Sequence, residues 1–308
     1  MSKIIVTGGA GFIGCAVISK LQKEGHEIFV IDNLSFGKRE FINVQDDHFY
    51  RTDILDRKAV FSIFETVRPD IVVHLAAIHF IPYCNQHPFE SSNININGTI
   101  NILDAIKKNP VKQFFFASTA AVYPIYDEAV SETHEVGPMD IYGLSKLTGE
   151  HLCNEFHLQT NIPVIVCRFF NAFGPNETNP HLIPEIQQQV NTGLRVIQLG
   201  NLTPKRDFIH TSDMANAVHV LLSNIQEGIH IYNLGRGIEY AVTEIVESFS
   251  RQIGEEIKIE VDPARVRKVE RMHLLADVTK LKKLGWEPLV DIDGGIKTLV
   301  TQWQTENR

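Results

Sequence analysis

Apolar and polar positions follow two different patterns along the first two thirds of the chain. Short runs rich in β-branched and aromatic residues carry few polar positions, and they lie at residues 4–7, 27–31, 71–75, 113–118 and 163–168. Longer segments repeat apolar residues every three or four positions, and they cover residues 59–67, 93–108 and 142–159. Buried strands that alternate with one-sided helices are typical of a parallel sheet covered on both faces. The pattern therefore predicts an α/β fold with a doubly wound parallel sheet.

The first predicted strand runs into a glycine-rich turn, Gly8-x-x-Gly11-x-x-Gly14, and a helical pattern follows. A diphosphate can approach such a turn because no Cβ stands in the way, and the N–H groups that begin the helix can hold the anion. Asp32 ends the second strand, where its carboxylate can accept hydrogen bonds from adenosine ribose hydroxyls and would repel a 2′-phosphate. Together these features predict a Rossmann dinucleotide site that binds NAD rather than NADP.

The pattern changes after Asn171, where prolines interrupt shorter elements. Residues 229–234 repeat the buried-strand pattern, so the chain is expected to return briefly to the sheet. We predict an NAD-binding domain of residues 1–171 plus about 212–235, and a smaller C-terminal α/β lobe of residues 172–211 and 236–308 that binds the substrate. Ligands of open α/β sheets bind outside the carboxyl ends of the strands, so the site is expected between the sheet and the lobe.

Composition and charge narrow the range of functions. The chain has 308 residues, a formal net charge of −8 and no basic run, so we expect no nucleic-acid partner. It has no apolar stretch of membrane-spanning length and begins with a strand pattern rather than a signal peptide, so we expect a cytoplasmic protein with no membrane partner. Its four cysteines form no C-x-x-C pair and its 13 histidines show no ligand spacing, so we expect no metal site.

One predicted helix carries a candidate catalytic pair. Tyr142 and Lys146 stand four residues apart, on one helix face. A phenol with a pKa of about 10 is a poor base at neutral pH, but a nearby lysine charge and the positive nicotinamide ring both favour the phenolate. Tyr142 could then take a hydroxyl proton while the same carbon delivers hydride to NAD⁺. Ser118 and Thr119 end the strand that borders this pocket, where a hydroxyl can hydrogen-bond the reacting oxygen.

Ten short motifs stand in one order along the chain. They are residues 7–14 (TGGAGFIG), 32–34 (DNL), 53–54 (DI), 74–77 (HLAA), 95–99 (NINGT), 118–123 (STAAVY), 142–146 (YxxxK), 168–175 (RFFNAFGP), 206–210 (RDFIH) and 233–235 (NLG). In this order they resemble the extended short-chain dehydrogenase/reductase family, specifically its NAD-dependent nucleotide-sugar epimerase/dehydratase group. Members of that group commonly form homodimers by packing two helices of each subunit, so the resemblance also implies a homodimer through residues 95–108 and 142–159.

The resemblance assigns roles to individual residues. It implies cofactor contacts from Gly8, Gly11, Phe12, Ile13, Gly14, Asp32, Asn33, Asp53, Ile54, Leu75, Ala76, Ala77, Asn95, Ser118, Tyr142, Lys146 and Phe169. It makes Thr119, Tyr142 and Lys146 the catalytic residues. Substrate contacts are implied for His79, Thr119, Tyr142, Asn171, Arg206 and Arg267. His79 could be an added acid/base group or a partly exposed loop histidine, and Arg267, which lacks the Gly-Asp that usually follows, could instead form a surface salt bridge.

The residues after Thr119 separate the possible reactions. Family 4,6-dehydratases carry an Asp-Glu pair there and decarboxylases a Glu, whereas this chain has Ala120 and Ala121, which cannot transfer protons. The resemblance therefore favours a nucleotide-sugar 4-epimerase that oxidises C4 transiently through a 4-keto sugar, with a UDP-sugar as the family's usual substrate. The alternative is a dehydrogenase, 4-keto-sugar reductase or dehydratase on the same scaffold, and a remoter one is a non-catalytic NAD-binding regulatory protein. The residues alone do not separate UDP from GDP, CDP or dTDP.

Overall fold

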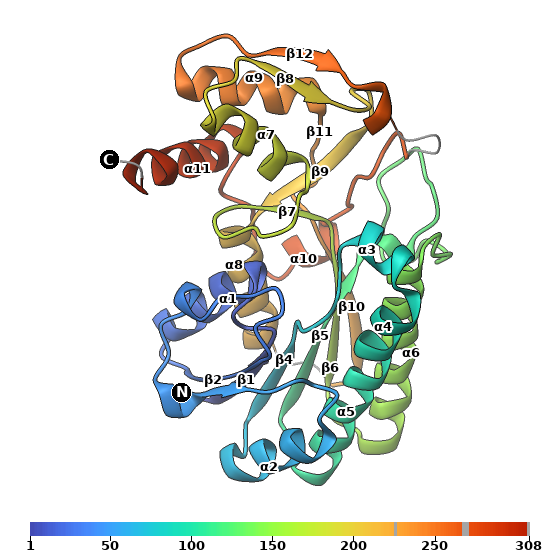
Figure 1. The fold of residues 1–308 in the computed structure, drawn as a ribbon. Coiled ribbons are helices and arrows are strands. Elements are labelled where there is room, and N and C mark those ends of the chain that lie inside the picture. The colour runs from blue at the N-terminus through green and yellow to red at the C-terminus, as the bar shows by residue number, and fades with distance from the viewer. Residues whose placement is uncertain (225–226, 267–270, 307–308) are drawn as a thin grey trace.

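The computed structural model describes residues 1–224, 227–266 and 271–306. Among these residues, seven strands form a central sheet in the order β10-β6-β5-β4-β1-β2-β3, and every neighbouring pair is parallel (Figure 1). The strands are β1 (Lys3–Thr7), β2 (Glu27–Asp32), β3 (Phe49–Arg51), β4 (Ile71–His74), β5 (Gln113–Thr119), β6 (Val164–Phe169) and β10 (Ile229–Leu234). The predicted doubly wound parallel sheet is confirmed, including the return of residues 229–234 to its edge.

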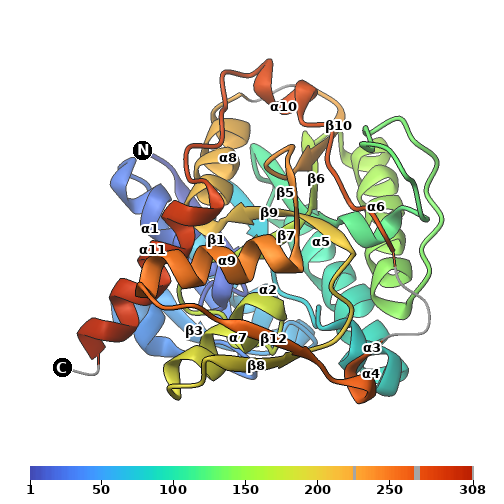
Figure 2. The same cartoon turned by 90° about the horizontal axis from the view of Figure 1, so that it is seen from above.

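Helices cover both faces of this sheet (Figures 1 and 2). One face carries α1 (Phe12–Lys23) and α8 (Thr211–Ser223), and the other carries α2 (Arg57–Val67), α5 (Gly98–Lys108) and α6 (Ile141–Thr160). Each face has its own core, since Val17 and Met214 pack in one apolar cluster and Phe64 and Phe156 in the other. In the described ranges, no helix is long and apolar enough to span a bilayer.

The helix predicted at residues 93–108 extends further toward its N-terminus. It is preceded by α3 (Ile81–Gln86) and α4 (Pro88–Ser92), and a π-helical turn, η3 (Asn93–Asn97), joins α4 to α5. Proline at the first or second position of α3 and α4 starts each short helix, because proline needs no backbone N–H partner there. Short 3₁₀ turns lie elsewhere, at η1 (Arg39–Phe41), η2 (Asp46–His48), η4 (Ala120–Val122) and η5 (Pro263–Arg265).

A smaller lobe stands over the carboxyl ends of the central strands (Figure 1). Its strands form two small sheets, β7 (Asn171–Phe173) with β9 (Lys205–His210) and β11 (Glu239–Ala241), and β8 (Val196–Leu199) with β12 (Lys258–Val261). Its helices are α7 (Leu182–Asn191), α9 (Val242–Ile253) and α11 (Ile292–Glu306), while α10 (Thr279–Lys282) packs beside β10. Phe173, Ile186 and Phe249 share a separate apolar core of the lobe. The boundaries predicted for the two domains stay a prediction.

Residues 271–277, which we call the strap, join the lobe to the sheet domain. Backbone N–H groups of Lys205 and Asp207 on β9 donate to the strap carbonyls of Met272 and Leu274, at 2.8 and 2.9 Å. On its other side, the strap exchanges two backbone hydrogen bonds of 2.9 Å with Val130 of the sheet domain. The strap therefore fixes the lobe relative to the loop that follows β5.

Candidate functional site

A cavity of about 1420 Å³ lies between the carboxyl ends of the central strands and the lobe. Most residues predicted to contact a cofactor line it, namely Gly8, Gly11, Phe12, Ile13, Gly14, Asp32, Asn33, Asp53, Ile54, Leu75, Ala76, Ala77, Ser118, Tyr142, Lys146 and Phe169. The residues predicted to contact a substrate that also line it are His79, Thr119, Asn171 and Arg206. The fold thus brings residues that lie far apart in the sequence together in one cavity.

The glycine turn leaves room for a ligand because side chains cannot fit there. Gly8 has φ of +69°, and a Cβ on it would stand 2.7 Å from the backbone nitrogen of Ala76. A Cβ on Gly14 would stand 2.7 Å from the Cα of Gly9. The turn therefore packs backbone against backbone and directs the first N–H groups of α1 toward the cavity, a cradle that fits a diphosphate.

The end of β2 supplies acceptors at one end of the cavity. The Asp32 carboxylate accepts from the backbone N–H groups of Ala10 (3.0 Å) and Leu34 (2.8 Å), so it is held firmly at the mouth of the glycine turn. Burial raises the pKa of Asp32, and these two N–H groups oppose that rise. Asn33 donates to the Asp53 carboxylate at 2.9 Å, which links the two loops that would flank an adenosine.

One predicted cofactor residue, Asn95, does not line the described part of the cavity. Asn95 lies behind the wall, where its amide holds the backbone of Ile78 (2.8 and 2.9 Å) and the Ser145 hydroxyl (3.0 Å). It thereby positions the segment before His79 and the residue beside Lys146, and its direct contact with a cofactor stays a prediction. Arg267 lies outside the described residues.

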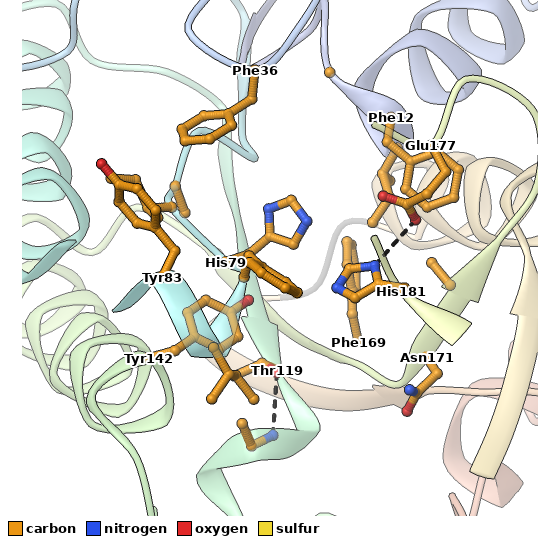
Figure 3. A pocket seen from close by; sticks show the side chains of 18 of the residues that line it. Phe12, Phe36, His79, Tyr83, Thr119, Tyr142, Phe169, Asn171, Glu177 and His181 are labelled. Carbon is orange, nitrogen blue, oxygen red and sulfur yellow. Dashed lines mark hydrogen bonds and ion pairs between the residues drawn. The ribbon is translucent and has the colours of Figure 1, made fainter. Parts of the chain in front are cut away.

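Thr119 and Tyr142 meet where β5 ends and α6 begins. The Asp140 carboxylate caps α6 by accepting from the Gly143 N–H at 2.7 Å, which places Tyr142 in the first turn, facing the cavity. Thr119 accepts from the Ala121 N–H at 3.1 Å, and its side chain lines the same cavity as the Tyr142 phenol. Burial raises the pKa of Tyr142, and the nearby Thr119 side chain opposes that rise. Figure 3 shows the two side chains on the same side of the cavity.

Lys146 lies one helical turn below Tyr142 and is buried. Its ammonium is 4.1 Å from the centre of the Phe116 ring, and burial lowers its pKa to about 8. The Lys146 charge is thus poorly solvated, and its electrostatic effect on groups in the cavity is weakly screened. Ala120 and Ala121 line the cavity next to Thr119 and offer no titratable group there.

A loop from the lobe reaches over the cavity and contributes groups that the sequence did not predict. Asn179 donates to the His79 Nε2 at 3.0 Å, and the His181 ring is 5.9 Å from the His79 ring. Glu177 pairs with His181 at 3.5 Å (Figure 3). Burial lowers the pKa of His79 to about 4, so this imidazole is neutral at pH 7. Prolines obscure any periodicity in this loop, and no signal in the sequence places it over the cavity.

Arg265 and Arg271 of the lobe also line the cavity. Arg265 forms ion pairs with Glu185 and Asp262. Arg271 donates from Nη2 to the Tyr123 carbonyl (2.6 Å) and from Nη1 to the Pro124 carbonyl (3.3 Å). In this segment the sequence alone indicated only Arg267, because the family motif has its arginine there.

Comparison with known proteins places the chain among characterised relatives. Residues 4–235 match the NAD dependent epimerase/dehydratase family. A UDP-glucose 4-epimerase of Bacillus subtilis is 32% identical over 312 residues, covering 92% of this chain and 91% of that protein. A crystal structure of Thermus thermophilus UDP-glucose 4-epimerase with NAD is similar at a TM-score of 0.89 and 29% identity, covering 98% and 99% of the two chains. A Thermotoga maritima UDP-glucose 4-epimerase with UDP-glucose is similar at a TM-score of 0.91 and 28% identity, covering 99% and 100%.

Proposed function

The chain belongs to the NAD dependent epimerase/dehydratase family, and from that premise we propose that it is an NAD-dependent nucleotide-sugar 4-epimerase. The observation that carries this proposal is that Thr119 and Tyr142 lie on the same side of a cavity where Ala120 and Ala121 supply no further proton donor. Epimerisation at C4 needs one proton-transfer group and hydride transfer, whereas elimination needs added acid and base groups. UDP-glucose 4-epimerases among the relatives support a UDP-sugar as the substrate.

The residues of the glycine turn and of the β2 end would hold NAD. Gly8, Gly11 and Gly14 allow its diphosphate to approach the α1 N-terminus, and Asp32 is placed to accept from the adenosine ribose. Bound NAD⁺ supplies the hydride acceptor at the sugar C4. The cavity encloses this group between the sheet and the lobe, which suits a reaction whose hydride must return to the same sugar.

Tyr142 and Thr119 would handle the proton of the sugar O4. The Tyr142 phenolate accepts the O4 proton as hydride leaves C4, and Thr119 keeps the phenol and the reacting oxygen aligned. The buried Lys146 charge, one helical turn from Tyr142, would favour the phenolate over the neutral phenol. After the 4-keto sugar has rotated within the cavity, Tyr142 would return the proton to O4 as C4 receives hydride on its opposite face.

Arg206 and Asn171 would hold the diphosphate of the nucleotide sugar. Arg206 stands on β9 at the lobe side of the cavity, and its Nη1 donates to the Lys205 and Arg271 carbonyls at 2.8 Å. These bonds fix the guanidinium plane, which is suited to gripping phosphate oxygens. A sugar that is anchored most firmly through its diphosphate can rotate within the cavity, as return of hydride to the opposite face requires.

The decisive experiment is proton NMR of the purified holoprotein in D2O with UDP-glucose and UDP-galactose, and with related nucleotide sugars, without added cofactor. We expect conversion to the C4 epimer with no deuterium in the sugar, because C4 hydrogen leaves and returns as hydride. Deuterium at C5 or C6 would indicate elimination. Product limited to one equivalent, with NADH accumulating, would indicate net oxidation and contradict the proposal.

We also propose that two copies pack through α6 and its neighbours. Leu144 and Leu158 on the outer face of α6 are 53% and 66% exposed, and Phe89 on α4 is 85% exposed. Large apolar side chains on adjoining elements are typical of an interface between subunits. Light scattering is expected to give twice the chain mass of 34.8 kDa, and Leu144→Glu with Leu158→Glu should yield the monomer. A wild-type monomer of 34.8 kDa would contradict this prediction.

We propose that the enzyme works in the cytoplasm. Cys15, Cys84, Cys153 and Cys167 are all buried free thiols. Unpaired thiols are typical of a reducing compartment, which supports this assignment.

A further inference from the structure

Arg271 is a cationic side chain in the cavity that the proposed chemistry does not use. Its guanidinium is held by two consecutive carbonyls, those of Tyr123 and Pro124, and it lines the cavity with Leu274 and Met139. These two bonds use two of its five N–H groups. In the described ranges, its remaining three N–H groups have no acceptor, so they are available to a ligand.

Among the described residues, the charge of Arg271 also has no ion-pair partner. Within the part of the chain that the structure describes, no carboxylate lies within ion-pair distance of it, whereas Arg265 in the same cavity pairs with Glu185 and Asp262. Burial lowers the pKa of Arg271, and the Asp140 charge partly offsets this. A half-buried cation without an ion pair is costly, and an anionic group of a ligand would relieve that cost.

The position of Arg271 relates it to the sugar rather than to the adenosine. Its own carbonyl accepts from Arg206, which marks the diphosphate end of the cavity. Its side chain reaches the carbonyls of Tyr123 and Pro124, which follow the strand that ends at Thr119. Arg271 therefore lies between Arg206 and the loop that follows β5, which would place it beside the sugar of a substrate whose diphosphate is held by Arg206.

We propose that Arg271 is a specificity-determining residue that selects nucleotide sugars with a carboxylate on the sugar ring. This inference rests on the proposed function and deepens it by naming the substrate class as nucleoside-diphosphate uronates. The planar guanidinium presents parallel N–H groups that match a carboxylate, and a neutral hydroxymethyl group in the same place would leave the charge unpaired. The hydrogen bonds from the Arg271 guanidinium to two backbone carbonyls hold the plane of the group in place. Little side-chain ordering is therefore needed when the substrate binds.

The test compares UDP-glucuronate with UDP-glucose in the holoenzyme. We expect the wild type to show kcat/KM at least about 10-fold higher for UDP-glucuronate, and Arg271→Met to lower that value about 100-fold while changing UDP-glucose less than about 3-fold. Arg271→Lys, which keeps the charge and loses the fork, should fall between these limits. Arg265→Met is the matched control and should leave the ratio of the two substrates unchanged.

Two kinetic results would overturn the proposal, and so would one binding result. The first is a higher kcat/KM of the wild type for UDP-glucose than for UDP-glucuronate. The second is an equal loss of kcat/KM for both substrates in Arg271→Met, which would mean that Arg271 only holds the backbone of residues 123–124 in place. Calorimetric binding of UDP alone should be unchanged in Arg271→Met, and a weaker affinity would assign Arg271 to the diphosphate instead. If the wild type binds UDP-glucuronate more tightly than UDP-glucose but epimerises neither, the proposed function fails and the carboxylate site stands.

Discussion

Tyr142→Phe is expected to lower kcat for C4 epimerisation about a thousand-fold, because the variant lacks the group that accepts the O4 proton. Phenylalanine preserves the ring, so the cavity wall keeps its shape and NAD should remain bound. The Thr119 hydroxyl keeps its hydrogen bond to the Ala121 N–H, so this part of the cavity wall should not change. Turnover is measured by NMR with UDP-glucose, and bound NAD by its absorbance after denaturation.

Tyr83→Phe provides the matched control. Tyr83 lines the same cavity, but its hydroxyl points away from Tyr142 and donates to Glu90 at 2.8 Å (Figure 3). We expect this variant to keep kcat within about threefold of the wild type, because its hydroxyl takes no part in proton transfer. A similar loss of kcat in both variants would mean that activity depends on the polarity of both tyrosine hydroxyls and not on a base at position 142.

The pH dependence of kcat follows from the same groups. Wild-type kcat should rise with pH as the phenol of Tyr142 ionises, because only the phenolate accepts the proton. Burial raises the pKa of Tyr142, so the rising limb depends on positive charge close to the phenol. Burial also lowers the pKa of Lys146 to about 8, so the Lys146 charge is lost, and its support for the phenolate declines, as pH increases beyond that value. In Tyr142→Phe the rising limb should be absent.

The central sheet could be predicted from sequence because its signal is local. Runs such as residues 4–7 and 113–118 are apolar on both faces, and only a strand covered on both sides buries them without cost. The glycine turn is equally local, since the positive φ of Gly8 and the close packing of Gly14 are set within a few residues. These features determined the fold class and the position of the cavity.

Other parts of the site depend on contacts between distant residues. Asn179 meets His79 and Arg271 meets Tyr123 only because the lobe closes over the sheet, across about a hundred residues of sequence or more. No periodicity or turn signal records such docking. Asn95 is a second example. Its motif can be recognised in the sequence, but the sequence does not show that its amide points toward the Ile78 backbone rather than into the cavity. Local patterns predict the scaffold, and the substrate side of the cavity is set by tertiary packing.

Glu150→Gln is expected to destabilise the fold by about 3–5 kcal/mol, because it leaves the buried Arg168 charge without its partner. Arg168 on β6 and Glu150 on α6 are almost fully buried and form a two-point ion pair, with Nε–Oε1 at 3.0 Å and Nη2–Oε2 at 2.7 Å. Burial alone would lower the pKa of Arg168, but its hydrogen bonds and charge pairing with Glu150 raise it. Ser118 donates to the same carboxylate, so one network joins α6 to the end of β5.

The free energy of unfolding from urea titration measures this effect, with Glu155→Gln as the control on the same helix. Glu155 accepts from Gln159 on the exposed side of α6, so its loss should change stability by less than about 0.5 kcal/mol. The double variant Glu150→Leu with Arg168→Met removes both charges and should recover much of the stability, because no unpaired ion then remains in the core. A Glu150→Gln protein as stable as Glu155→Gln would show that water or another group reaches Arg168. The catalytic helix would then be held by its apolar face alone.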